Sequence, residues 1–200
     1  MPMTMSHFRL TFIYFMSLFL LGCAAAPVPN RLQFLGYQGH VNDHQIVVRA
    51  PAPHVYSLLT DFDTFASLIP SNRILVTKVT PDPMDIGTIT STETGYKIKL
   101  RWHSKVVEKK ADRLIVLQFQ DGIFHGGYEV WNLQPEGNAT RVSHTIVYNI
   151  SNPVYRLLWM LKHGESKHDV LVEATLLHLK ERCEGTEIVQ TGREPTTSIP

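Results

Sequence analysis

Residues 96–106, YKIKLRWHSKV, alternate between two kinds of side chain. The odd-numbered positions are all basic: Lys97, Lys99, Arg101, His103 and Lys105. The even-numbered positions carry the apolar and aromatic side chains, with Ser104 as the one small polar member. Because successive side chains of a strand point to opposite faces, this period of two predicts a strand with one covered face and one face in water. An antiparallel sheet that buries one face is the expected centre of the fold.

Runs rich in β-branched and apolar residues lie on both sides of this stretch and predict further strands. They cover residues 45–49, 73–80, 87–94, 113–120, 124–134 and 139–150. Turn-forming sequences at residues 121–122 (DG) and 135–138 (PEGN) separate the later runs. Consecutive strands with short turns between them predict an antiparallel meander.

Two short helices are expected between the first of these strands and the meander. The first begins near Pro53, and its apolar residues Val55, Leu58 and Leu59 recur at helical spacing. The second ends at Pro70, which cannot continue a helix.

One long helix is expected at the end of the chain, over residues 153–183, with Asn152 or Ser151 as its cap. Its predicted core stripe is Val154, Leu157, Leu158 and Leu161, followed by Val172, Thr175, Leu176 and Leu179. Between the two halves the stripe passes through Glu165 and His168, and Gly164 is a point where the helix could bend.

This order of elements and two local sequences resemble a known superfamily. Residues 48–62, VRAPAPHVYSLLTDF, are similar to the opening of START-like proteins of the polyketide cyclase and coenzyme Q-binding superfamily. Residues 137–142, GNATRV, resemble the turn into the family's last strand. The resemblance covers about residues 41–183 and implies an α+β helix-grip fold, in which a curved antiparallel sheet wraps around a long C-terminal helix. It implies a hydrophobic cavity but no single activity, because members carry lipids or quinones, cyclise polyketides or sense hormones.

The N-terminal sequence predicts export and lipid anchoring. The apolar run 10–21 is too short to span a bilayer and fits the core of a signal peptide. It ends in residues 20–23, LLGC, which resemble the bacterial lipobox, where the cysteine is lipidated. The expected organisation is a signal peptide at 1–22, lipidation at Cys23, a tether at 23–39, the START-like domain at 40–184 and a disordered tail at 185–200. The resemblance to Gram-negative lipoproteins implies, from Ala24 after the cysteine, an outer-membrane protein that faces the periplasm. Its tether would reach at most roughly 55 Å.

Two alternatives remain open for this segment: an ordinary cleaved signal in which Cys23 is incidental, and an uncleaved anchor. In either case a bridge between Cys23 and Cys183, the only two cysteines, becomes possible. If Cys23 is lipidated, Cys183 is a lone thiol.

Composition excludes several classes of partner and cofactor. The formal net charge is +1, and no basic run is interleaved with aromatic residues, so nucleic acid is not an expected partner. No cysteine and histidine spacing fits a metal site. His163 and His168 are five residues apart, which separates their directions on a helix by about 140°. Neither a metal nor another cofactor is therefore expected.

The candidate binding site centres on His144. Parity places it on the covered face of its strand with Val142 and Ile146, while Glu165 and His168 come from the facing helix. The candidate cavity residues are Tyr96, Leu100, Trp102, His144, Ile146, Tyr148, Leu161, Glu165 and His168. Mostly apolar walls with a few polar groups are typical of a small-molecule site. In the alternatives, His144 is a core histidine paired with Glu165 or a carbonyl group, or a bend at Gly164 turns both helix residues to water.

These observations favour a membrane-anchored protein that binds or carries a hydrophobic small molecule: a lipid, a quinone or a polyketide-like compound. No catalytic residue is assigned. One alternative is a cyclase or dehydratase that uses His144 or Tyr148 as a general acid–base. The other is an envelope protein with a filled core that acts through a protein partner, which the sequence does not name.

Overall fold

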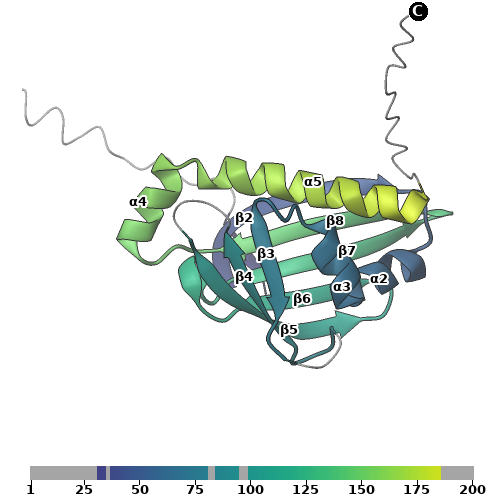
Figure 1. Ribbon diagram of the computed structural model, residues 1–200, viewed down its shortest axis with the longest axis horizontal. Coiled ribbons are helices and arrows are strands. Elements are labelled where there is room, and N and C mark those ends of the chain that lie inside the picture. Colours follow the sequence, from purple (N-terminus) through teal and green to yellow (C-terminus); the bar gives the residue numbers. More distant parts are fainter. Residues whose placement is uncertain (1–30, 35–36, 81–83, 95–98, 186–200) are drawn as a thin grey trace, which may run out of the picture. The chain divides into compact units, whose positions relative to one another are not determined.

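The computed structural model describes residues 31–34, 37–80, 84–94 and 99–185. The fold is that of the compact unit that begins at Leu32, described as far as Gly185. It is the expected α+β helix-grip fold, in which a curved antiparallel sheet wraps around a C-terminal helix (Figure 1). The predicted meander is confirmed, because the strands from β3 (Ile74–Lys78) to β8 (Ala139–Tyr148) pair in sequence order.

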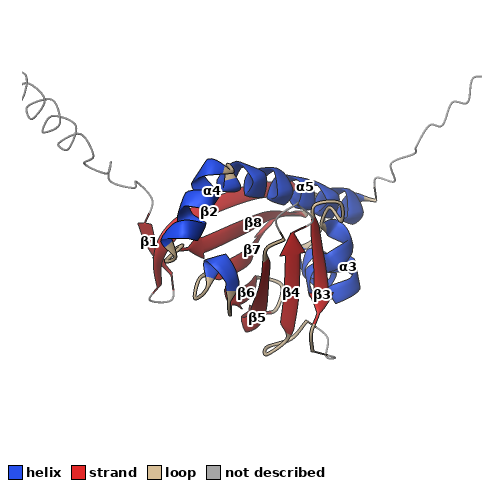
Figure 2. Cartoon of the chain, turned by 60° about the vertical axis from the view of Figure 1, so that its left-hand side comes forward, coloured by secondary structure: helices blue, strands red, loops and turns tan. Residues whose placement is uncertain are grey.

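In the described part of the chain, the sheet contains eight strands in the order β1-β2-β8-β7-β6-β5-β4-β3. Their bounds are β1 Arg31–Phe34, β2 Tyr37–Val48, β3 Ile74–Lys78, β4 Ile89–Thr94, β5 Arg101–Lys110, β6 Leu114–Phe119, β7 Tyr128–Glu136 and β8 Ala139–Tyr148. Each neighbouring pair of strands in this order, from β2–β8 through to β4–β3, is antiparallel. The meander ends with β8, and β2 is added to the sheet by pairing with that strand. Figure 2 shows the sheet curling beneath the helices.

The alternating stretch that predicts the sheet contributes to β5. Ser104 and Val106 are buried on its covered face, and the pairing with β6 shifts by a bulge between Val106 and Glu108. The strand begins at Arg101 and runs on to Lys110, later in the sequence at both ends than expected. Tyr96 lies outside the described residues.

Two other strand predictions need correction. The first long strand, β2, begins at Tyr37 and not at residue 45, and its polar residues from His40 onward pair in unbroken register with β8. Residues 124–127 are not part of β7: Gly122–Phe124 form a short 3-10 helix, η1, which buries Ile123 and Phe124. An apolar run can thus be buried without being a strand.

The two short helices are α2, Ala52–Thr60, and α3, Phe62–Leu68. Asp61 ends the first and caps the second, since its side chain accepts a hydrogen bond from the backbone N–H of Thr64 at 2.8 Å. Val55, Leu59 and Phe65 face the core.

The predicted terminal helix is in fact two helices, α4, Pro153–Leu161, and α5, Gly164–Glu184. Asn152 caps α4 as expected, accepting from the N–H groups of Val154 and Tyr155. The break falls at His163, whose φ of 52° lies in the left-handed region. Figure 1 shows α4 turned away from the axis of α5 at this point.

The main core lies where α2, α3 and the second half of α5 pack on the sheet. It includes Val48, Val55, Leu59, Phe65, Val106, Leu117, Trp131, Leu133, Val142, Val172, Leu176 and Leu179. Each buried side chain of this kind stabilises the fold by about 1.5–3 kcal/mol relative to exposure. This end of the molecule holds the helix against the sheet.

The ordered sheet extends into the segment expected to be a tether, since β1 and the start of β2 lie before residue 40. The expected signal peptide, Cys23 and the tail from residue 186 lie outside the described residues. Among the residues described, no helix has both the length and the hydropathy needed to cross a bilayer.

Candidate functional site

A cavity of about 440 Å³ lies between the concave face of the sheet and helices α4 and α5. Its apolar wall includes Phe65, Ile69, Ile74, Val76, Leu100, Trp102, Leu117, Phe119, Ile123, Phe124, Trp131, Ile146, Leu158, Trp159, Leu171 and Val172. Four small polar residues also line it from β4 and β5: Thr90, Thr92, Thr94 and Ser104. This size and this mixture are typical of a small-molecule site.

A hydrogen-bonded polar group sits on the cavity wall at β7 and β8. The Oε1 atom of Glu129 accepts from the indole N–H of Trp131 at 2.9 Å and from His144 Nε2 at 3.2 Å. Trp131 and His144 are opposite each other in the register of the two strands. Their rings pack edge to face, with the ring centroids 4.5 Å apart. The buried imidazole is thereby fixed in orientation.

The pKa of Glu129 reflects this pairing. Burial alone would raise the pKa of the carboxyl group. The hydrogen bond and charge of His144, with the hydrogen bond from Trp131, outweigh burial and hold the pKa below its ordinary value of 4.5. The group is therefore a carboxylate at neutral pH, inside a largely apolar cavity.

His168 faces this group from α5. Its ring lies 5.9 Å from that of His144, and the Nδ1 atoms of both rings are buried with no hydrogen-bond partner among the described residues. Burial, followed by repulsion from the charged form of His144, lowers the pKa of His168 to about 3. A neutral imidazole with an unpaired nitrogen thus borders the cavity, able to contact a polar group of a ligand.

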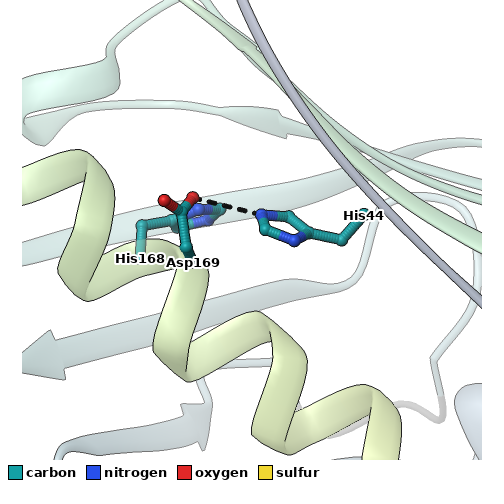
Figure 3. A group of neighbouring side chains, drawn as sticks. All are labelled: His44, His168 and Asp169. Atoms are coloured by element: carbon teal, nitrogen blue, oxygen red, sulfur yellow. Dashed lines mark hydrogen bonds and ion pairs between the residues drawn. The ribbon is translucent and has the colours of Figure 1, made fainter.

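A second polar group adjoins the first where β2 meets α5 (Figure 3). His44 is the register partner of His144, and its Nε2 atom lies 3.0 Å from Asn42 Oδ1 and 3.2 Å from Asp169 Oδ1. The potential ligand atoms of His44, His168 and Asp169 all lie within 4.8 Å of one another. Of the residues described, these three are the ones grouped closely enough to hold a metal ion.

The structure brings together five of the nine residues predicted for the cavity. Leu100, Trp102, His144, Ile146 and His168 line it. His144 is buried as strand parity predicts, but its carboxylate partner is Glu129 and not Glu165.

The remaining four residues lie elsewhere. Tyr96 is outside the described residues, and Tyr148 packs beside the cavity against Phe124 and Trp159. Burial and then the charge of Glu165 raise the pKa of Tyr148 to about 12. Glu165 is half exposed and pairs with His40 at 2.8 Å, away from the cavity. Placing Leu161 on the wall was wrong: it is 61% exposed, because the chain turns immediately after it.

Glu129, His44 and Asp169 were not among the predicted site residues. A signal for Glu129 exists, because it shares strand parity with Trp131 and Leu133 and so belongs on the covered face. The pair of His44 and Asp169 joins positions 125 residues apart, so no local spacing could have indicated it.

The cavity wall at α4 carries an exposed apolar surface. Tyr155, Leu158 and Trp159 line the cavity, yet none of the nine residues of α4 is buried. Its exposed apolar side chains are Val154, Tyr155, Leu157, Leu158, Met160 and Leu161. Basic side chains, Arg156 and Lys162, lie among them. Exposed apolar patches bordered by polar residues mark sites of interaction with proteins or membranes.

Comparison with known proteins gives a family match and many similar folds. Residues 48–167 match the family model described as "Polyketide cyclase / dehydrase and lipid transport". The structure of TTHA0849 from Thermus thermophilus superposes with a TM-score of 0.60 at 21% identity, covering 74% of this chain and 99% of that one.

Two further structures have the same fold. Protein CV1439 from Chromobacterium violaceum has a TM-score of 0.53 at 16% identity, over 72% of this chain and 96% of that one. The solution structure of KanY has a TM-score of 0.61 at 12% identity, over 74% and 99%. Identities this low establish the shared fold alone. No curated protein sequence matches the chain.

Proposed function

Because the chain belongs to the polyketide cyclase/dehydrase and lipid transport family, we propose that it binds and carries a hydrophobic small molecule in the cavity between sheet and helices. A lipid, a quinone or a polyketide-like compound has the required chemistry. Apolar contact would supply the affinity, at about 25 cal/mol per Å² buried. The group formed by Glu129, His144 and His168 would orient one polar end of the ligand.

The cavity itself carries this proposal. Its volume of about 440 Å³ is within the range of sites for small molecules, and its walls are mainly apolar. The alternative of an interaction protein with a filled core fits this volume poorly.

Native mass spectrometry of the full chain, purified from its own host's envelope fraction and followed by solvent extraction, tests the proposal. The expected result is a defined adduct that extracts as an apolar compound. Leu100→Glu places a charge on the cavity wall and should abolish the adduct and the uptake of an apolar fluorescent probe. Leu75→Glu is the matched control, because Leu75 is 57% exposed on β3 and does not line the cavity. Equal retention by both variants would exclude this cavity as the binding site.

The enzyme alternative rests on one observation. His144 is oriented by Glu129 and presents an unpartnered Nδ1 atom, an arrangement suited to a general base. Comparing the compounds extracted from the native protein and from His144→Ala separates the two functions. Identical masses from both proteins support carriage. A different compound that accumulates in the variant identifies a reaction that needs His144.

Membrane anchoring through Cys23 forms the second part of the proposal, with the outer membrane facing the periplasm as the location. It is supported by the lipobox-like residues 20–23 and by the exposed apolar surface of α4.

Fractionation of host cells, with a metabolic label for protein-bound acyl chains, tests the anchor. Cys23→Ala should lose the label and leave the membrane fraction, whereas Cys183→Ala should retain both. An unlabelled native protein, or a Cys23→Ala variant that fractionates normally, would favour an ordinary signal or an uncleaved anchor.

A further inference from the structure

We propose that His44, His168 and Asp169 bind a divalent transition-metal ion of the zinc class at the edge of the cavity. The site joins β2 to α5 and shares His168 with the orienting group of Glu129, His144 and His168. Figure 3 shows His168 and Asp169 side by side on α5, with His44 directed toward them from the strand.

The spacing of the potential ligand atoms suits such an ion. Bonds of about 2.0–2.2 Å in a tetrahedral site leave neighbouring ligand atoms roughly 3.3 Å apart. His44 Nε2 and Asp169 Oδ1 are 3.2 Å apart, and no separation within the group exceeds 4.8 Å. Closing the widest gap therefore needs a shift of at most about 1.5 Å, which rotation of the side chains can supply.

The chemistry of the three groups favours this class of cation over Ca²⁺ or Mg²⁺. Two imidazoles and one carboxylate are ligands that zinc and its neighbours prefer, whereas the hard cations take oxygen atoms almost exclusively. The single carboxylate leaves a bound divalent ion with a net charge of +1, which suits a fourth ligand with an oxygen donor.

Independent support comes from the unsatisfied nitrogen of His168. Buried polar atoms nearly always have a partner, yet the Nδ1 atom of this ring has none among the described residues. His168 lies beside His44 and Asp169 but forms no hydrogen bond with either of them. A purely structural role therefore explains its position poorly. Rotation of its ring toward a shared ion would satisfy it.

The surroundings provide an outer partner and an open position. The amide of Asn42 donates to Asp169 Oδ1 at 2.7 Å and would hold the carboxylate in place. His168 also lines the cavity, so an ion here would face the cavity edge. Water, or an oxygen atom of a cavity ligand, would complete its coordination.

Titration calorimetry with Zn²⁺ on the untagged, chelator-treated full chain tests the site, with Co²⁺ absorption as a report of ligand geometry. The expected result is one Zn²⁺ per chain and a tetrahedral Co²⁺ spectrum. Asp169→Asn and His168→Gln should each weaken binding by at least about tenfold. Asp169 is about a third exposed, so its isosteric variant keeps the test valid if His168→Gln does not fold.

Glu165→Gln is the matched control. Glu165 forms the other histidine–carboxylate pair between β2 and α5, with His40, and has no second histidine beside it among the described residues. Its removal should leave Zn²⁺ affinity unchanged. The proposal is overturned if the native chain binds no Zn²⁺, or if Asp169→Asn binds it as tightly as Glu165→Gln does.

Discussion

The two helices that end the chain bury their apolar side chains to very different degrees. The second half of α5 buries Val172, Leu176 and Leu179, each exposed by 5% or less. In α4 no residue is buried, and Met160 and Leu161 are more than 60% exposed. Both segments have apolar residues at helical spacing, so the pattern alone does not reveal which one is covered.

The difference follows from what each segment has beneath it. The end of α5 packs on the core and is held by polar contacts to the sheet and to α3: Lys180 Nζ donates to the Val47 carbonyl at 2.6 Å, and His178 Nδ1 lies 2.7 Å from the Leu68 carbonyl oxygen. Beneath α4 and the start of α5 lies the cavity. The end of α5 therefore stabilises the fold. By contrast, α4 and the start of α5 cover the cavity and are available to contact a ligand.

The largest change in the free energy of unfolding is expected when a leucine is truncated to alanine in α5, in contrast to the same truncation in α4. Leu179→Ala removes a fully buried side chain and should lower the free energy of unfolding by about 2–5 kcal/mol. Leu161→Ala, at the exposed end of α4, should change it by no more than about 0.5 kcal/mol. Denaturant titration followed by circular dichroism measures both. Similar losses would show that α4 belongs to the core and that the contrast is mistaken.

A smaller effect is expected at the junction of the two helices. A Cβ atom on Gly164 would overlap the ring of Trp159, which packs directly over the glycine at the cavity wall. Gly164→Ala should therefore cost about 1–3 kcal/mol, as overpacking usually does, and should shift the tryptophan fluorescence.

A double-mutant cycle isolates the cause of that loss. With Trp159→Ala as background, the overlap is gone, and Gly164→Ala should no longer destabilise the protein. An equal cost in both backgrounds would mean that Gly164 is required for backbone conformation and not for the approach of the ring.

The sequence predicts the elements of this fold well because their signals are local. A period of two, over the described residues 99–106 and on the strand of His144, correctly indicates the covered face of the sheet. Helical spacing indicates which residues share a face but not what lies opposite, so Leu161 was wrongly assigned to the wall. The sequence indicates a possible bend at Gly164, but the break falls one residue earlier, at His163, whose left-handed conformation is uncommon for a residue other than glycine.

The candidate site is only partly accessible to the same reasoning. Glu129 could have been found, since it occupies an inward position on its strand beside Trp131. The group of His44, His168 and Asp169 could not, because it depends on the register of β2 with β8 and on the rotation of α5. Distant pairs of this kind are fixed only by the assembled structure.

The smallest effect concerns the contact that fastens the end of α5 to β2. Hydrogen bonds from Lys180, and from the backbone and side chain of Arg49, lower the pKa of Glu184 to about 2, from an ordinary value of 4.5. A depressed carboxyl pKa stabilises the folded state above pH 4.5, and this contribution is lost as the pH falls from 4.5 toward 2. Glu184→Gln should therefore lower the Tm at neutral pH, and its difference from the native protein should vanish near pH 2.

Glu173→Gln removes a charge from the exposed side of the same helix and is the control. A Tm difference for Glu184→Gln that is independent of pH would mean that the side chain holds the helix by packing and not by its charge.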